Sequence, residues 1–214
     1  MKVALIGGTG GIGTKLSEYL VEKKFECIAV GSGLCDVTNE DSVKEFIDKE
    51  KPEVVIYLSV NNIDGLIHKQ TEETVNYQLE VNLKGFLRVL RHATPHMREA
   101  NFGRIIYMSS ILSTNPIKGT GVYSASKAFG DTLVKVHSLE NAKYGITTNS
   151  IQMGYFDAGL TNRVPEKVMD SVIDSIPLKR LGDVAELADV VETIIKTEYI
   201  NGAQIAVSGG YANT

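Results

Sequence analysis

The sequence predicts an α/β fold in which a parallel, doubly wound β-sheet carries helices on both faces. Short apolar runs alternate with segments of helical periodicity along the whole chain, which is typical of repeated βαβ units. No linker-like or low-complexity stretch interrupts this alternation. The 214 residues, of which 43% are hydrophobic, therefore predict a single domain that spans residues 1–214.

In the amino-terminal half, apolar runs predict strands at residues 2–6, 27–30 and 53–60. The third run is continuously apolar from Val54 to Leu58, as expected of a strand covered on both faces. Helical periodicity predicts helices around residues 12–20, 43–47 and 72–100. Thr38 and Asp41 resemble a capping box before the second helix, and Pro52 marks its end.

The carboxyl-terminal half continues the same alternation. It predicts strands at residues 104–108, 146–153 and 204–207, and helices at 123–143, 168–173 and 184–195. Parallel strands joined by right-handed crossovers have their carboxyl ends at one edge of the sheet, where ligands bind. We therefore expect the functional residues to follow the strands.

Composition narrows the partners and the compartment. The net charge of −4, without a Lys/Arg cluster, argues against nucleic acid and against anionic membranes as partners. The first apolar stretch is too short for a signal peptide or a membrane span. Cys27 and Cys35 could form at most one bridge, which favours a reducing compartment. We expect a cytoplasmic protein.

A glycine-rich turn, residues 7–13, directly follows the first strand and opens the first helix. This is the context that a dinucleotide-binding fingerprint requires. Glycines permit the tight turn and let the backbone approach a pyrophosphate, while amides at the helix start face the anion. A surface turn without a ligand is the simpler alternative. With a ligand, the turn indicates a Rossmann-type fold.

Tyr123 and Lys127 lie at i and i+4, hence side by side on one helical face. A neighbouring cation favours the phenolate and lowers the pKa of a tyrosine, so Tyr123 could serve as a general acid. Alone, such a pair is more often a solvated helix face. Ser110, just beyond strand 104–108, is expected where a bound carbonyl would accept a hydrogen bond from its hydroxyl.

These motifs and several others stand in a familiar order: the glycine turn, Cys35-Asp36-Val37, Val81-Asn82, Ser109-Ser110, Tyr123 with Lys127, residues 176–182, Ile200-Asn201-Gly202 and residues 207–210. In this order the chain resembles the short-chain dehydrogenase/reductase family, classical type, and most of all its 3-oxoacyl-acyl-carrier-protein reductase branch. The resemblance covers nearly the whole chain. It implies an NAD(P)-dependent oxidoreductase that interconverts a small-molecule carbonyl and alcohol, assembled as a homodimer or homotetramer through its long helices.

The resemblance also implies residue roles. Ser110 would orient the carbonyl, Tyr123 would donate or accept the proton, and Lys127 would lower the tyrosine pKa and hold the nicotinamide ribose. Asn82 would complete a water-linked proton relay, although a helix residue that bonds the backbone is the simpler alternative. The implied cofactor contacts are Gly7, Thr9, Gly10, Gly11, Ile12, Gly13, Ser32, Asp36, Val37, Leu58, Ser59, Val60, Tyr123, Lys127, Gly154 and Phe156, with Asp36 at the adenine ring.

Two segments depart from the family pattern. Residues 57–60 stand where the family has Asn-Asn-Ala-Gly, so Leu58 and Val60 partly replace small residues, and Asn61-Asn62 follow too late to match without a shift. Met153 and Ala158 stand where the family has a proline and a threonine that touches the nicotinamide amide. Thr161 could replace that threonine only if its loop takes an unusual path.

The chain is also shortened after the second strand. Only residues 31–34 separate that strand from Cys35-Asp36-Val37, where the family has a helix and the approach of a further strand. We therefore expect this helix to be deleted and the sheet to have six strands or a vestigial seventh. The adenine side of the cofactor site should be more open.

The choice between NAD and NADP depends on the end of the second strand. No acidic residue stands there to accept a ribose 2′-hydroxyl and repel a 2′-phosphate. Gly31, Ser32 and Gly33 could admit a phosphate, yet no Arg or Lys stands beside them to neutralise it. We expect NADP or NAD, with a slight preference for NADP.

Two weaker signals have simpler interpretations. His92 and His96 lie one helical turn apart, as metal ligands can, but no third ligand and no HExxH motif accompany them, so we interpret them as helix surface and expect no metal. Residues 154–164 could form a substrate lid or an ordinary connecting loop. As a lid, this segment would place Tyr155, Phe156 and Ile111 around an apolar pocket.

Two alternative functions remain at this point. A sugar-nucleotide epimerase or dehydratase also uses a tyrosine and lysine pair, but those enzymes generally carry a larger carboxyl-terminal substrate domain. A non-catalytic dinucleotide sensor or scaffold is suggested by the altered cofactor segments. The complete set of Ser110, Tyr123 and Lys127 favours the reductase over both.

Overall fold

A single parallel sheet of six strands, in the order β2-β1-β3-β4-β5-β6, organises the chain. The computed structural model describes residues 1–211, apart from the side chain of Arg163. The strands are β1 (Lys2–Ile6), β2 (Glu26–Val30), β3 (Val54–Tyr57), β4 (Gly103–Ser110), β5 (Ile146–Met153) and β6 (Gln204–Val207). The predicted doubly wound α/β fold is confirmed.

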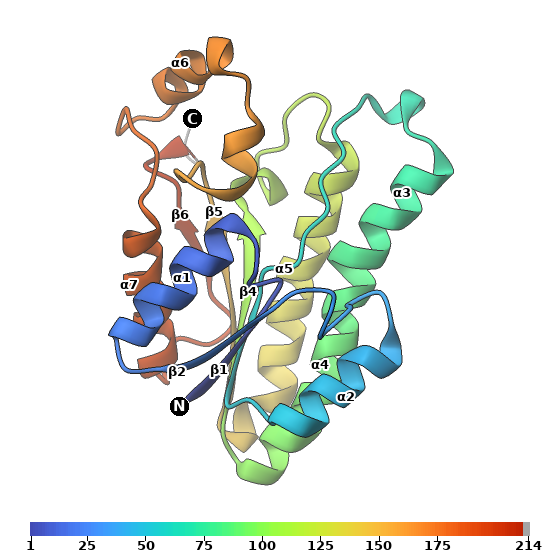
Figure 1. Ribbon diagram of the computed structural model, residues 1–214, viewed down its shortest axis with the longest axis vertical. Helices are drawn as coiled ribbons and strands as arrows, with labels where there is room; N and C mark the ends of the chain where they lie inside the picture. Colours follow the sequence, from blue (N-terminus) through green and yellow to red (C-terminus); the bar gives the residue numbers. More distant parts are fainter. Residues whose placement is uncertain (212–214) are drawn as a thin grey trace.

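Helices cover both faces of this sheet (Figure 1). The α-helices are α1 (Gly11–Glu22), α2 (Glu40–Glu50), α3 (Glu72–Leu79), α4 (Gly85–Ala100), α5 (Gly121–Asn141), α6 (Glu166–Ser175) and α7 (Val184–Lys196). A π-helical turn, η2 (Glu80–Lys84), joins α3 to α4 and makes residues 72–100 one helical run, as the sequence predicts. None of the helices in residues 1–211 is both long and apolar enough to cross a membrane.

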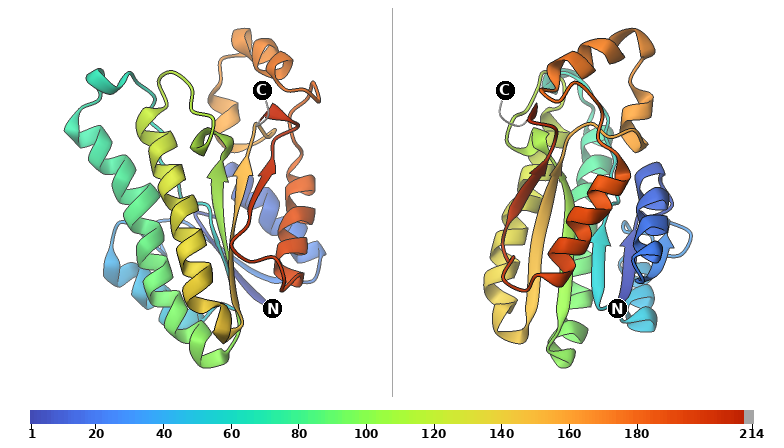
Figure 2. Two further views of the ribbon diagram at one scale, coloured as in Figure 1. Left: turned by 180° about the vertical axis from the view of Figure 1, so that it is seen from behind. Right: turned by 90° about the vertical axis from the view of Figure 1, so that its left-hand side faces the viewer.

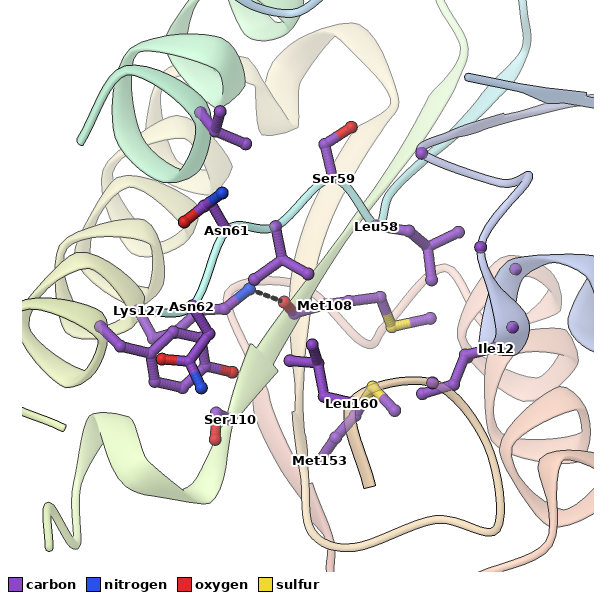
Figure 3. A pocket seen from close by; sticks show the side chains of 18 of the residues that line it. Ile12, Leu58, Ser59, Asn61, Asn62, Met108, Ser110, Lys127, Met153 and Leu160 are labelled. Carbon is purple, nitrogen blue, oxygen red and sulfur yellow. Dashed lines mark hydrogen bonds between the residues drawn. The ribbon is translucent and has the colours of Figure 1, made fainter. Parts of the chain in front are cut away.

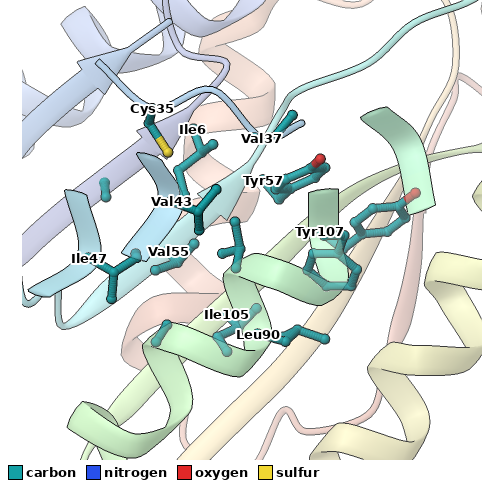
Figure 4. Packing of buried hydrophobic residues seen from close by; sticks show 14 of the residues in the cluster. Ile6, Cys35, Val37, Val43, Ile47, Val55, Tyr57, Leu90, Ile105 and Tyr107 are labelled. Carbon is teal, nitrogen blue, oxygen red and sulfur yellow. The ribbon is translucent and has the colours of Figure 1, made fainter. Parts of the chain in front are cut away.

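Two apolar clusters hold the three layers together. On one face α2, α4 and α5 pack on the sheet, with Tyr57, Phe86 and Tyr107 in mutual ring contact (Figure 4). On the other face α1 and α7 pack against alternate strand residues such as Leu5 and Ile106. Because β3 and β4 are buried on both faces, their continuous apolar runs are explained.

The carboxyl ends of the strands meet at one edge of the sheet (Figures 1 and 2). The segment with α6 lies at this same edge, and the long helices α4 and α5 run side by side along one face of the sheet. Loops that follow β1, β2, β3, β4 and β5 converge there. This arrangement places the residues of the five loops within reach of one ligand.

The predicted shortening after the second strand is confirmed. Turns alone fill residues 31–39 between β2 and α2, and β2 lies at the edge of the six-stranded sheet. The predicted capping box of Thr38 and Asp41 is wrong, because the α2 cap is Asn39, whose side chain accepts a hydrogen bond from the Ser42 amide. Asparagine is among the strongest N-cap residues, and Thr38 instead donates to Asp36.

Candidate active site

A cavity of about 780 Å³ opens at the carboxyl edge of the sheet. Its volume lies within the range of about 300–1,000 Å³ that is typical of small-molecule and cofactor sites. The glycine turn forms one wall, and the ends of β3, β4 and β5 form the floor (Figure 3). Except for Asn82, every predicted site residue lines this cavity.

The glycine turn is shaped for close approach of an anion. Gly7 has φ +83°, and a Cβ there would lie 2.5 Å from the Ser59 nitrogen. A Cβ on Gly13 would lie 2.6 Å from the Cα of Gly8. No side chain caps α1, so the amides of its first turn are available to a phosphate. These residues fit the pyrophosphate of a dinucleotide.

The opposite end of the cavity is built from the short segment after β2, and it is called the adenine end here because the resemblance predicts the adenine ring there. Ser32 is exposed there, while Asp36 is half-buried and Val37 is buried. The Oδ1 atom of Asp36 accepts hydrogen bonds from the Thr38 amide at 2.9 Å and the Thr38 hydroxyl at 2.7 Å. One carboxylate oxygen of Asp36 is thus used to build the turn.

Asn82 lies behind the cavity wall, completely buried in the π-helical turn. Its Oδ1 accepts from the Asn61 amide at 2.7 Å, and its Nδ2 donates to the Asn61 carbonyl at 2.8 Å and the Ser126 hydroxyl at 3.0 Å. The side chain therefore fixes the segment after β3 onto α5. These bonds agree with the simpler of the two roles predicted for Asn82, and the proton relay stays a prediction.

Ser110, Tyr123 and Lys127 line one end of the cavity, which is called the catalytic end here because the resemblance predicts catalysis by these residues. Ser110 is the last residue of β4, and its hydroxyl is close enough to Tyr123 to act on the pKa of the phenol. The ammonium of Lys127 donates to the Met108 carbonyl at 2.6 Å and lies 5.8 Å from the centroid of the Tyr123 ring. Asn62 lines the same cavity, and its Oδ1 is buried without a hydrogen-bond partner among the described residues.

Burial dominates the electrostatics of this end. Burial, opposed by the Ser110 hydroxyl and assisted by the charge of Asp64, raises the pKa of Tyr123 to about 12. Burial also lowers the pKa of Lys127 to about 8. The pKa of Tyr123 is therefore raised and not lowered, because desolvation of the phenolate dominates, and the effect of Lys127 on this pKa stays a prediction.

The segment after β5 folds over the glycine turn and lines the cavity. A Cβ on Gly11 would lie 3.0 Å from the nitrogen of Gly159, so the two backbones nearly touch. Tyr155, Phe156 and Ile111 all line the cavity, and Thr161 does so as well. Phe156 is buried against Gly182. The segment therefore lies where a substrate lid would lie, and its role as a lid or as an ordinary connecting loop stays a prediction.

Comparison with known proteins agrees with this geometry. The family model described as "Enoyl-(Acyl carrier protein) reductase" matches residues 14–212. A 3-oxoacyl-(acyl-carrier-protein) reductase, MabA of Mycobacterium avium, is 31% identical over 97% of this chain and 88% of its own length. The chain belongs to the short-chain dehydrogenase/reductase family. Acetoacetyl-CoA reductase of Shinella zoogloeoides is another relative, 30% identical over 98% of both chains.

Solved structures of lower sequence identity share this reductase fold. An actinorhodin polyketide ketoreductase variant, solved with NADPH, superposes with a TM-score of 0.91 at 21% identity, over 100% of this chain and 98% of that one. A 3-oxoacyl-(acyl-carrier-protein) reductase from Brucella melitensis superposes with a TM-score of 0.90 at 22% identity, over 98% and 91% of the chains. At these identities the likeness shows the fold alone.

Sequence reasoning missed two side chains that lie outside the cavity but contact the elements around it. The Tyr57 hydroxyl donates to the Val81 carbonyl at 2.6 Å and so braces the π-helical turn, a role that its place in an apolar run conceals. Asp131 was also missed, although a charge four residues after Lys127 on the same helix was a readable signal.

His92 and His96 pair with Glu40 and Asp48 of α2, so they are half-buried helix contacts rather than free surface.

Proposed function

We propose that this protein reduces a carbonyl to an alcohol, with a nicotinamide dinucleotide as hydride donor and Tyr123 as proton donor, within one domain of residues 1–214. The observation that carries the proposal is the convergence of Ser110, Tyr123 and Lys127 at one end of a cavity whose other wall is the glycine turn. A dinucleotide held by its pyrophosphate at that turn would reach both ends of the same cavity.

A bound reduced nicotinamide supplies the hydride, and the chain supplies the proton and the orientation. The Ser110 hydroxyl donates to the carbonyl oxygen and fixes its position. Tyr123, kept neutral by burial, donates its phenolic proton to that oxygen as negative charge develops on it. An alkoxide is a stronger base than a phenolate, so this transfer is downhill even with a raised tyrosine pKa. The nearby Lys127 ammonium then stabilises the phenolate until solvent returns the proton.

The relatives suggest the first substrates to test. Their names specify 3-oxoacyl thioesters on acyl carrier protein and acetoacetyl-CoA. The cavity wall beyond Ser110 includes Ile111, Leu112 and Tyr155, which suit an apolar acyl segment. We therefore propose a 3-oxoacyl thioester as the substrate class.

NADP is the proposed cofactor, with NAD as the alternative. No acidic side chain ends β2, and Ser32 and Gly33 leave open space beside the expected ribose. Among the described cavity-lining residues, Lys127 is the single lysine or arginine, and it lies at the catalytic end. A 2′-phosphate would therefore be held by solvent-exposed groups, so the preference for NADP should be small.

We also propose a homodimer or homotetramer that works in the cytoplasm. Exposed apolar side chains on the outer face of α5, Phe129, Val136 and Leu139, would be covered in such an assembly. Cys27 and Cys35 are both free, in keeping with a reducing compartment. Light scattering of the purified protein would test the assembly, and a stable monomer at high concentration would contradict it.

The decisive experiment separates binding from turnover. NADPH and NADH are titrated by fluorescence, and acetoacetyl-CoA reduction is then followed with the wild type and Tyr123→Phe. We expect the variant to keep cofactor affinity within about threefold and to lose about 10²–10⁴-fold in kcat. Tight cofactor binding without reduction of any oxoacyl, ketone or sugar substrate by the wild type would instead support a sensor. Full activity of Tyr123→Phe would refute the tyrosine as proton donor.

A further inference from the structure

Three ionisable side chains follow one another at intervals of one turn along α5. Tyr123, Lys127 and Asp131 stand at i, i+4 and i+8, so they lie on one stripe of the helix. Their exposures are 7%, 3% and 3%, so all three are buried. The phenol and the ammonium belong to the proposed active site, whereas Asp131 has no place in it so far.

Asp131 is held by two other elements of the fold. Its Oδ2 accepts a hydrogen bond from the Ser113 hydroxyl at 2.6 Å and another from the Gln152 amide at 3.0 Å. The same Gln152 amide also donates to Ser113 at 3.1 Å. Ser113 belongs to η3 (Ile111–Ser113), directly after Ser110, and Gln152 belongs to β5. The carboxylate thus joins α5 to the strand ends that carry the site.

The surroundings of Lys127 leave its charge poorly compensated at short range. Among the described residues its ammonium donates a hydrogen bond to one neutral carbonyl, that of Met108, and the Tyr107 ring centroid lies 4.9 Å away. A buried ammonium is costly without an opposite charge. Asp131 does not form a direct ion pair with Lys127, but its charge opposes the lowering of the lysine pKa by burial.

The other titratable groups nearby do not compensate Lys127. Tyr107 of β4 and Tyr57 of β3 are buried phenols, and burial raises the pKa of both. Tyr123 is likewise kept neutral by burial, and Asp64 is exposed in the segment after β3, where its charge acts on Tyr123. Asp131 is therefore the buried carboxylate that can balance the ammonium.

We propose that Asp131 is a positioning residue that keeps Lys127 protonated at neutral pH and, through Ser113 and Gln152, fixes α5 against the strand end that carries Ser110. This inference rests on the proposed function for its effect on turnover, but not for its effect on the charge of Lys127. Removal of the carboxylate charge lowers the pH at which Lys127 loses its proton. The activity, which depends on the ammonium, then declines at a lower pH.

The test uses Asp131→Asn, which removes the charge but keeps an oxygen that can accept both hydrogen bonds. The matched control is Ser113→Ala, which removes one of these hydrogen bonds and leaves the carboxylate in place. Nitrogen-15 NMR of labelled lysine side chains follows the titration of Lys127, whose signal is identified by its loss in Lys127→Met. The pH profile of kcat for acetoacetyl-CoA reduction is measured in parallel.

We expect Asp131→Asn to move the Lys127 titration and the alkaline limb of kcat down together by about one pH unit, which corresponds to a tenfold change in the equilibrium. The KM should stay within about twofold, and Ser113→Ala should leave both midpoints in place. An unchanged Lys127 titration in Asp131→Asn would overturn the proposal. A Lys127 that is already neutral at pH 7 in the wild type would overturn it too, even if the variant fails to fold.

The two possible failures remain distinguishable. A wild type that reduces no carbonyl, but whose Lys127 titration moves in Asp131→Asn, would refute the proposed function and support the charge role of Asp131. A wild type that is an active reductase, with a Lys127 titration that does not respond to Asp131→Asn, would refute the charge role alone.

Discussion

The two ends of the cavity are built on different parts of the sheet. The catalytic end lies on the interior strands β4 and β5 and on the longest helix, α5, where Ser110, Tyr123 and Lys127 are all buried. The adenine end lies beyond the edge strand β2, where Ser32 is exposed and Asp36 is half-buried. Electrostatic interactions between side chains should therefore be strong at the buried catalytic end and weak at the exposed adenine end.

The difference follows from solvation. A charge in the interior interacts strongly with its neighbours because little water screens it, whereas charges at an exposed edge are screened within about 10 Å by salt. Substitutions at the catalytic end should consequently change activity by orders of magnitude. Substitutions at the adenine end should change affinity or cofactor choice by smaller factors.

The largest expected effect is that of Lys127→Met. The variant removes the ammonium beside Tyr123 and keeps an unbranched side chain of similar length, so the phenolate loses its stabilising charge. We expect kcat to fall about 10²–10⁴-fold. The matched control is Lys135→Met on the exposed face of the same helix, which should stay within about twofold. Equal activities of the two variants in steady-state assays would contradict a special role for Lys127.

The free energy of unfolding should depend on pH because Lys127 is buried at the catalytic end. Because the pKa of Lys127 is lowered to about 8 in the folded protein, the unfolded chain binds this proton more tightly. Below about pH 8 both the folded and the unfolded chain carry this proton, and its burial lowers the free energy of unfolding. As the pH rises from about 8 towards 10.5 only the unfolded chain keeps the proton, so the free energy of unfolding increases.

Denaturant unfolding of the wild type and Lys127→Met across that interval measures this contribution. The free energy of unfolding of the wild type should rise relative to that of the variant, by an amount on the order of 3 kcal/mol. Other titrating groups, such as Cys35 and Tyr123, contribute to both proteins and cancel in the difference. Parallel curves for the two proteins would show that Lys127 keeps an ordinary pKa.

Sequence reasoning succeeded at the catalytic end because local spacing determines its geometry. The i, i+4 relation of Tyr123 and Lys127 fixes their adjacency once a helix forms, and Ser110 follows a strand whose apolar run is unmistakable. It failed on the tyrosine pKa, because burial comes from the packing of the whole chain. Asp131 shows the same limit, since its partners Ser113 and Gln152 come from separate elements.

At the adenine end the sequence predicted the topology better than the contacts. The short connection after β2 correctly predicted a missing helix and a six-stranded sheet. The contacts depend on turn hydrogen bonds that composition does not reveal, such as those from Thr38 to Asp36 and from Ser42 to Asn39. Asn82 is similar, because its bonds to Asn61 arise only after β3 and the π-helical turn come together.

A moderate effect is expected from Ser32→Asp. A carboxylate at this position would accept a hydrogen bond from a ribose 2′-hydroxyl and repel a 2′-phosphate. The ratio of the NADPH and NADH dissociation constants should move about tenfold towards NADH, as fluorescence titration would show. The control Ser32→Ala should change this ratio by less than about threefold. A ratio unaffected by the aspartate would mean that the adenine ribose lies elsewhere.

The smallest expected effect is that of Asp36→Ala on cofactor affinity. Because the Oδ1 atom of Asp36 already accepts two hydrogen bonds from Thr38, the substitution should mainly loosen the turn before α2. We expect a stability loss of about 1–2 kcal/mol by denaturant unfolding, with NADPH affinity changed by less than about threefold. Thr38→Val, which removes only the hydroxyl bond, should lose about half as much stability. A tenfold loss of NADPH affinity at unchanged stability would instead establish a direct contact between this carboxylate and the adenine, and would make the exposed end as selective as the buried one.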